Sequence, residues 1–468
     1  MSAQVSSVHP SLCRPRHGHP PDDGGAPPPS WVLLDLHAYV ADRENATSAY
    51  SVMSNGEAIR VTFCTAPPPL VSYICVWCPN LPPTELVMEP TIEVAEDDLV
   101  HFCVSIRAYR FCCDHFVYKA PSDGKGPSLS LLEKPERYLQ CRHGLALLGH
   151  REVGDIRAHV EDDGHYYLAA LHHGRRPWDF SLVLYNSMDK KWSSRNFSLY
   201  RPHIHMTAKT ISFGEGGLLG FVDAWRSIII FDILGRKPEH YLPLPKHLIR
   251  LNTIHDEPLL SRDIAFVNGR LTLVEMHRNT SDQSLSCSWE VSTWSISSPW
   301  KGQDGWQMDY RFNTSSIVVD DGTANVDLLR QLRDNGATPQ PALDGLLFAH
   351  PTLSLSESHI VYLMCEVSMW DKKTLVLSID MRNPRLQGAA TFDAERMMGY
   401  TYAQSRISKF FNMVPGLKGG LKRPGKFHMQ YPRKHWIGID NEPTQHSGFT
   451  QRQEDTIADG GDINMAVD

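Results

Sequence analysis

Short apolar runs separated by polar turns fill the chain from Trp31 to about residue 395. Apolar runs bounded by Gly, Pro, Asn, Asp and Ser are typical of β-strands. The runs are IRVTFC, SYICVW, VHFCVSI, YYLAAL, SLVLYN, SIIIFDI, DIAFV, LTLVEM, SWEVSTWSI, HIVYLMCEV and TLVLSID. Helical periodicity is confined to two short candidates, Asn325–Arg333 and Phe392–Met398. The pattern therefore predicts an all-β protein.

One sequence element recurs along the chain. It is an apolar strand that ends in an aromatic or β-branched residue, followed by a polar turn and another strand. The copies end at Trp77, Tyr118, Tyr185, Phe231, Trp294 and Ile379, at spacings of 41, 67, 46, 63 and 85 residues. A four-stranded propeller blade occupies about 40–50 residues, so the wider gaps require long loops or a missed blade. We predict a propeller of about six four-stranded blades, within a range of five to seven; a β-sandwich or another two-sheet architecture is the alternative.

Composition divides the chain into three parts. Residues 1–30 are rich in Pro, Gly, Ser and His and are predicted to be disordered. Residues 31–410 form the predicted propeller-like domain, and residues 411–468 a flexible tail that is first basic and then acidic. The first residues lack the apolar segment of a secretory signal, although an organelle transit peptide is a second interpretation. No run of about 18 apolar residues predicts a membrane helix.

Charge and cysteine content narrow the class of protein further. The net charge is −7, so no overall positive field favours nucleic-acid binding. The 10 cysteines are too few for a disulfide-stabilised scaffold, and most lie within apolar runs. We therefore expect reduced thiols and a location in the cytoplasm, the nucleus or both.

Five cysteines invite comparison with a zinc site. Cys75 and Cys78 are spaced as a metal-binding pair, and Cys103, Cys112 and Cys113 follow. Structural zinc sites usually combine two such pairs on turns. Here the first pair lies in an apolar strand, and adjacent residues of a strand face opposite ways. We predict that these cysteines are core thiols, with zinc as the alternative.

Histidines form two local groups. His172 and His173 are adjacent, and His203 and His205 would share one face of a strand, which is compatible with metal binding. No third ligand at a fixed spacing accompanies them. We expect surface or turn histidines and predict no metal.

Acidic and glycine-rich segments are predicted to be turns. Asp162–Gly164 and Asp320–Gly322 each follow a strand-like run, and Asp-Gly is a strong hairpin signal; paired carboxylates or calcium ligands are the alternative. The segment 213–220 (FGEGGLLG) lacks the Lys-Ser/Thr of a phosphate-binding loop. No catalytic motif is present, and we predict no catalytic, cofactor-binding or metal residues and no cofactor.

The segment 418–434 (KGGLKRPGKFHMQYPRK) concentrates positive charge beside two aromatic residues. Its members are Lys418, Lys422, Arg423, Lys426, Phe427, Tyr431, Arg433 and Lys434. Such a segment is either a solvated linker or an element for nuclear import or RNA contact.

The middle of the chain carries a family resemblance. The residues concerned are Val222–Asp223 before Trp225, Phe231–Asp232 with the turn Leu234–Gly235, Leu242–Pro245, Arg262–Asp263 before an apolar strand, and Trp294 near Trp300 and Trp306. In this combination the segment from 218 to about 310 resembles DUF 1618, a plant domain of unknown function that is expanded in grasses. The opening PSWVLLDLHAYVADRENATSA looks like the start of those proteins. The resemblance implies a propeller-type protein, related in style to F-box-associated and kelch domains, without an established activity.

Three functional hypotheses follow. The first is a non-enzymatic protein-interaction scaffold that binds protein partners through loops on one propeller face. The second is a hydrolase-type enzyme, which requires clustered carboxylates or histidines with shifted pKa values in the central channel. The third is a nuclear regulator that uses residues 418–434. We predict the first, without membrane binding and with an unknown partner and oligomeric state.

Overall fold

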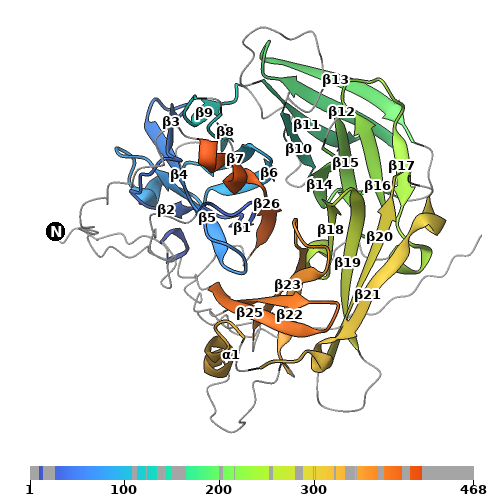
Figure 1. Ribbon diagram of the computed structural model, residues 1–468. Coiled ribbons are helices and arrows are strands. Elements are labelled where there is room, and N and C mark those ends of the chain that lie inside the picture. Colours follow the sequence, from blue (N-terminus) through green and yellow to red (C-terminus); the bar gives the residue numbers. More distant parts are fainter. Residues whose placement is uncertain are drawn as a thin grey trace, which may run out of the picture.

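The computed structural model describes residues 10–13, 27–107, 113–122, 124–133, 139, 144–149, 165–199, 204–214, 217–251, 257–279, 288–298, 300, 302–320, 323–332, 343, 345–366, 374–392 and 401–413. These residues form six β-sheets arranged as the blades of a propeller (Figure 1). The predicted all-β class and the blade number of about six are confirmed, and the β-sandwich alternative is wrong.

Blades II to VI each contain four antiparallel strands in chain order. Blade II has β6 (Thr91–Glu96), β7 (Leu99–Ser105), β8 (Cys113–Lys119) and β9 (Ser128–Leu131); blade III has β10 (Leu145–Gly149), β11 (Tyr166–His173), β12 (Asp179–Asn186) and β13 (Lys191–Ser198). Blade IV has β14 (Lys209–Ser212), β15 (Leu218–Asp223), β16 (Ser227–Asp232) and β17 (His240–Pro243). Blade V has β18 (Arg262–Val267), β19 (Arg270–Asn279), β20 (Ser288–Ser297) and β21 (Gln307–Asn313); blade VI has β22 (Leu347–Leu353), β23 (Ile360–Glu366), β24 (Thr374–Asp380) and β25 (Arg385–Phe392).

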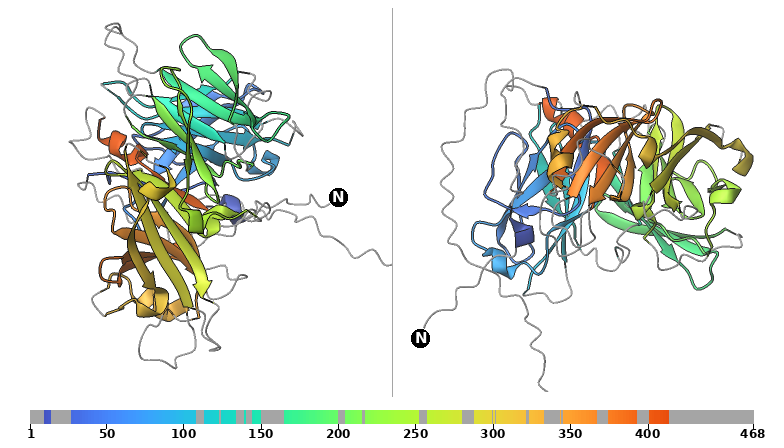
Figure 2. Two further views of the ribbon diagram at one scale, coloured as in Figure 1. Left: turned by 90° about the vertical axis from the view of Figure 1, so that its right-hand side faces the viewer. Right: turned by 90° about the horizontal axis from the view of Figure 1, so that it is seen from below.

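Blade I joins the two ends of the domain. Its strands follow the order β26 (Tyr402–Ser405), β1 (Val32–Asp35), β5 (Val71–Trp77), β4 (Ala58–Cys64) and β3 (Ala49–Val52), and β2 (Tyr39–Val40) also pairs with β5. The last strand, β26, pairs antiparallel with β1 over four residues. Figure 2 shows the orange-red C-terminal strand beside the blue N-terminal blade. The chain therefore closes the ring by supplying its own end to its first blade.

The first strand of each blade lies at the axis. Strands β26, β6, β10, β14, β18 and β22 contact one another in that cyclic order, and thus form a closed inner ring (Figure 1). Because the strands of blades II to VI alternate in direction, every connection from an outer strand to the next inner strand lies on the same side. We call this side the entry face, since the inner strands begin there, and the opposite side the exit face.

Strand β16 shows why the third strands read as continuous apolar runs. All six of its residues are buried. Ile228 and Ile230 belong to a core cluster shared with blade V, whereas Ile229 and Phe231 belong to one shared with blade III. Alternate residues thus face the two neighbouring blades. Full burial of each such side chain contributes about 1.5–3 kcal/mol.

The recurring sequence element marks one strand in every blade. Its six end residues lie on the third strand from the axis of blades I to VI: Trp77 on β5, Tyr118 on β8, Tyr185 on β12, Phe231 on β16, Trp294 on β20 and Ile379 on β24. The repeat therefore has the period of the blades, and the wide spacings hold loops instead of a missed blade.

A 33-residue segment between β21 and β22 follows the outer strand of blade VI. Val318 and Ala324 form isolated bridges to Arg385 and Gly388 of β25. The Leu386 and Ala389 main-chain nitrogens donate to the carbonyls of Val318 and Ala324 at 3.0 and 3.1 Å. The segment then forms α1 (Asp327–Leu332). The long spacing before Ile379 is thus a loop that covers the edge of its own blade.

Two local expectations need correction. The helix candidate at 325–333 is confirmed as α1, but Phe392 of the second candidate is the last residue of β25, and residues 393–398 lie outside the described residues. Phe392 packs with Tyr402 and Val376 at the interface of blades VI and I, so tertiary contacts override a weak helical pattern. In the segment predicted to be disordered, Pro10–Leu12 forms a 3-10 turn, and Leu12 is buried in the core of blades I and II because its side chain is apolar. No described helix is long and apolar enough to cross a membrane.

Ring closure can be tested by truncation. A chain that ends at residue 400 lacks β26, and we expect it to lose cooperative unfolding because the inner ring then has a gap. A chain that ends at residue 413 keeps all six blades, and we expect the Tm of the full chain. Circular dichroism melting distinguishes the two, and equal Tm values for both truncated chains would contradict the closure by β26.

Candidate functional site

Asp223 organises the entry-face turn of blade IV. Its carboxylate accepts hydrogen bonds from the main-chain nitrogens of Trp225 and Met206 at 3.0 and 2.9 Å and from Arg226 Nη1 at 3.0 Å. Burial raises the pKa of Asp223, and the bonds from Met206 and Arg226 oppose that shift. Because one carboxylate holds both segments, the positions of residues 206 and 225 are fixed relative to each other.

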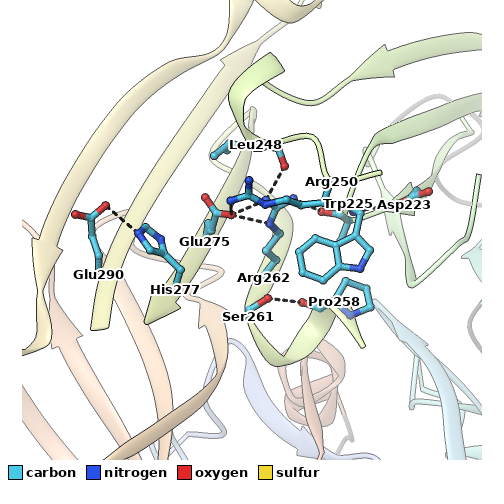
Figure 3. A network of polar contacts seen from close by, with 11 residues as sticks. Asp223, Trp225, Leu248, Arg250, Pro258, Ser261, Arg262, Glu275, His277 and Glu290 are labelled. Carbon is cyan, nitrogen blue, oxygen red and sulfur yellow. Dashed lines mark hydrogen bonds and ion pairs between the residues drawn. The ribbon is translucent and has the colours of Figure 1, made fainter. Parts of the chain in front are cut away.

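Arg262 links blade IV to blade V from a fully buried position (Figure 3). Its Nη1 donates to the Ala224 carbonyl at 2.9 Å, and Nη2 donates to the Leu248 carbonyl at 2.6 Å. Nε and Nη2 contact Glu275 Oε1 at 3.2 and 2.5 Å. The guanidinium also lies 4.7 Å from the centre of the Trp225 ring. The residues that carry the family resemblance thus build the interface between two blades.

A third arginine shares the same carboxylate. Arg250 Nη2 lies 3.5 Å from Glu275 Oε1, and its side chain is 48% exposed. The Arg250 main chain donates to the Trp225 carbonyl at 3.0 Å, and Arg226 Nη2 donates to the Leu251 carbonyl at 3.3 Å. Burial lowers the pKa of Arg262, and Arg250 lowers it further, while Glu275 acts in the opposite direction. The network is therefore rigid but richer in cations than in carboxylates among the described residues.

We expect Arg262→Ala to destabilise the protein by about 3–5 kcal/mol, because it leaves Glu275 and two carbonyls buried without their donor. Denaturant unfolding measures the effect. Arg382→Ala is the control: it removes an ion pair of 2.9 Å with Asp380 whose arginine is 55% exposed, and should cost much less than Arg262→Ala. Equal losses for the two variants would contradict a structural role for Arg262.

A second polar network crosses the axis. Lys209 Nζ of β14 donates to Asp263 Oδ1 of β18 at 2.8 Å and to Gln404 Oε1 of β26 at 3.2 Å. Asp263 Oδ2 also accepts from Gln404 Nε2 and, at 3.0 Å, from the Leu353 main chain of β22. Since β14 and β26 lie opposite each other in the ring, the contact from Lys209 to Gln404 spans it. Four blades are thereby joined, and both oxygens of Asp263 are occupied.

Glu96, the last residue of β6, faces this network from the exit side. Burial and the neighbouring Asp97 raise its pKa to about 8, although Arg406, Lys209 and a hydrogen bond from the Ser212 main chain act in the opposite direction. The side chain therefore keeps its proton at neutral pH. The hydrolase hypothesis requires clustered carboxylates or histidines with shifted pKa values, and Glu96 is one such carboxyl group.

Glu96 makes stability depend on pH with a definite sign. Its folded pKa of about 8 exceeds the reference value of 4.5, so the folded state holds the proton more tightly. The stabilisation is complete below about pH 4.5 and is lost as the pH rises through 8. We expect the unfolding free energy of wild type to fall relative to that of Glu96→Gln as the pH rises from about 4.5 to about 8. A difference that stays constant in urea titrations from pH 5 to 9 would show that the Glu96 pKa is normal.

Two of the candidate histidines, His173 and His205, lie close enough to influence each other. Burial lowers the pKa of His205 to about 3, and the neighbouring His173 and Arg226 lower it further. His205 Nε2 lies 3.2 Å from Thr207 Oγ1, whereas His173 is exposed at the end of β11. His203 lies outside the described residues. The expectation of turn or surface histidines is therefore correct for His173 and wrong for His205, because its ring is enclosed between blades III and IV.

The cysteine candidates separate into different surroundings. Cys75 is buried with its Sγ 3.8 Å from that of Cys64, and Cys78 Sγ lies 3.7 Å from Met53 Sδ. Cys103 and Cys113 are partly buried on β7 and β8 of blade II, and Cys112 lies outside the described residues. The described residues include no group of three or more His, Cys, Asp or Glu side chains arranged to hold a metal ion.

The remaining candidate segments are placed as follows. The described part of 213–220 joins β14 to β15, as a turn between strands should. Asp320 pairs with Arg385 at 2.5 Å, whereas Asp321–Gly322 and Asp162–Gly164 lie outside the described residues. Residues 418–434 also lie outside them, so a role in import or RNA contact stays a prediction.

Exposed apolar side chains gather on the entry face beside the arginine network. Ile204, Met206 and Leu251 are 49%, 43% and 50% exposed. Ile204 and Met206 flank the buried His205, as alternate residues of an extended segment do. Together with Trp225 and Arg250 they form what we call the entry patch. The hydrogen bonds of Asp223, Arg226 and Trp225 described above hold its segments side by side.

Sequence reasoning missed most of these residues. Lys209 and Gln404 are separated by 195 positions, and no local pattern pairs them. Glu96 is an ordinary carboxyl group in a hairpin until the ring encloses it. His350, which sits in a bulge of β22 where burial lowers its pKa to about 4, also carries no local signal. Asp223, Trp225, Arg262 and Asp263 stood out through the family resemblance, and His173 and His205 through their spacing in the sequence.

Comparison with protein families gives one match. Residues 221–362 match the DUF1618 family. Its description is "Protein of unknown function (DUF1618)". The DUF1618 match runs from β15 of blade IV to β23 of blade VI, and so contains Asp223, Trp225, Arg262 and Glu275. It supports the resemblance that the middle of the sequence carries. No curated protein matches the chain.

Solved propeller structures are similar at low identity. An α-L-arabinanase of Penicillium chrysogenum with arabinobiose is 13% identical, with 78% of this chain and 99% of that chain covered and a TM-score of 0.26. The SapL1 lectin with α-methyl fucoside is 9% identical (76% and 98% covered, TM-score 0.29). The WD40 domain of SCAP from fission yeast is 11% identical (81% and 99% covered, TM-score 0.28). TM-scores this low support no conclusion about ligands or activity.

Proposed function

We propose that this protein is a non-enzymatic binding protein that holds a partner protein against the entry patch. The exposure of Ile204, Met206 and Leu251 above a fixed backbone is the observation that carries the proposal. Met, Trp and Arg side chains are enriched in protein interfaces, and loops on a rigid scaffold are common binding sites. A partner that covers these side chains gains the free energy of burying apolar surface, about 25 cal/mol per Å².

The axial network supports binding over catalysis. Asp263 already accepts bonds from Lys209, Gln404 and the Leu353 main chain, so both of its oxygens are engaged within the protein. A catalytic carboxylate needs a free oxygen within hydrogen-bond reach of the reacting group. The bonds among Lys209, Asp263, Gln404 and the Leu353 main chain instead join four blades, and this gives the entry face a rigid base. We place the binding in the cytoplasm or nucleus, because Cys78 and Cys365 are buried thiols, as is usual in a reducing compartment.

Paired variants test the patch. Met206→Asp with Leu251→Asp places two charges on the entry face, and we expect it to abolish partner binding. Met188→Asp with Leu234→Asp is the matched control, because these side chains are 61% and 39% exposed on exit-face hairpins. Both proteins should keep the wild-type Tm, since the four side chains contribute little to the core.

The measurement is affinity purification of the three full-length proteins from an extract of the source organism, followed by titration calorimetry with each purified partner. A partner that binds wild type and control but not the entry-face variant supports the proposal. Equal binding by all three proteins, or no reproducible partner of the wild type, would contradict it.

Hydrolysis at the axis is the second candidate function, and Glu96 is the observation in its favour. A carboxyl group with a pKa of about 8 can donate a proton at neutral pH, as a general acid must. A hydrolytic activity that Glu96→Gln abolishes, while the Met206 and Leu251 variant retains it, would favour this function over partner binding.

A further inference from the structure

We infer that the entry patch receives an acidic peptide segment, in which a carboxylate lies beside apolar side chains. The inference rests on the proposed function and specifies the chemistry of the partner. It comes from the combination of exposed apolar side chains with the guanidinium of Arg250, whose charge the described carboxylates neutralise only in part.

Among the described residues, the three arginines of the network (Arg226, Arg250 and Arg262) outnumber its two carboxylates. Arg226 pairs with Asp223, and Arg262 pairs with Glu275, so each of these buried arginines has one acidic partner. Arg250 reaches only Glu275 Oε1, at 3.5 Å, among the described residues. That oxygen already contacts two nitrogens of Arg262 at 3.2 and 2.5 Å. About half of the Arg250 side chain faces solvent, and among the described residues its guanidinium has no carboxylate of its own.

The surroundings of Arg250 favour a carboxylate over other ligands. Arg175 and Arg176 are exposed in the entry-face turn that follows His173, and they extend the positive region toward blade III. Glu257 is an exposed acid on the same connection between β17 and β18, and its Oε1 accepts from the Leu259 main chain at 3.4 Å. An incoming carboxylate can form the two parallel hydrogen bonds that a guanidinium offers.

The apolar side chains decide which macromolecule carries that carboxylate. Leu251 follows Arg250 in the chain, and the bonds of Asp223 and Arg226 hold the segment of Met206 beside this one. A ligand that brings an anion to Arg250 can therefore also bring apolar groups to these side chains. A nucleic acid would offer phosphates without aliphatic side chains, and the chain's net charge of −7 opposes a polyanion. A peptide with Asp or Glu next to Leu, Ile, Met or Phe satisfies both features.

The test selects random 12-residue peptides from a displayed library against the purified full-length protein. We expect enrichment of sequences with an acidic residue adjacent to an apolar one. Synthetic copies of these peptides should bind about tenfold more weakly to Arg250→Gln, the approximate loss for one charge-assisted contact. Arg250→Glu should weaken binding further and should select peptides with Lys or Arg at the acidic position.

Arg236 supplies the matched control. It is 47% exposed, pairs with buried Asp232 at 3.0 Å and lies in an exit-face hairpin. Arg236→Gln should leave peptide affinity unchanged, and comparison of its Tm with that of Arg250→Gln separates a loss of folding from a loss of contact.

The possible failures are distinguishable. Peptides that depend on Met206 and Leu251 but show no acidic preference would overturn the inference and leave the proposed function intact. If no peptide is enriched while a folded partner still requires the patch, the inference of a linear segment is wrong. Peptides that ignore Met206, Leu251 and Arg250 alike would count against both. Binding of a single-stranded RNA 20-mer that Arg250→Gln abolishes would replace the peptide with a nucleic acid.

Discussion

Closure of the ring by β26 is the constraint on which the rest of the structure depends. A blade has two apolar faces and must be packed on both sides, so a row of blades is stable only when its two ends meet. Here the meeting point is a four-residue pairing between β26 and β1. The same short strand carries Gln404, which reaches Lys209 and Asp263 on the far side of the axis. Strand β26 therefore completes blade I and at the same time contributes to the polar network at the axis.

The interface of blades IV and V holds a buried arginine, and the family match covers it. A buried guanidinium is costly to desolvate, and is tolerated only when carboxylates and carbonyls surround it. Arg262 meets this condition through Glu275, Ala224 and Leu248. The geometry that satisfies it also fixes the entry-face segments around Trp225. The hydrogen bonds of Arg262 thus stabilise the interface of the two blades and also fix the conformation of the entry-face segments.

The sequence predicted the blades better than it predicted the site. Third strands counted from the axis, such as β16, are buried on both faces and therefore appear in the sequence as uninterrupted apolar runs. The recurrence of these runs predicted the number of blades. Residues at the axis carry no such signal, because Lys209, Asp263 and Gln404 acquire their meaning only when distant strands form a ring. The helix expected at Phe392 failed for the same reason: contacts with Tyr402 decide its state, and these are invisible locally. Asp223 and Arg262 were found through the family resemblance rather than through their chemistry.

The segment that follows β25 has a consequence for self-association. The outermost strand of a blade exposes a row of unpaired main-chain groups, and such an edge is a template on which a second molecule can add a strand. In blade VI, bonds from Leu386 and Ala389 to Val318 and Ala324 occupy part of that row. A side chain at Gly388 would stand 3.4 Å from the Ala324 Cβ, so the small residue permits this close approach. The loop thereby removes one route to aggregation at blade VI.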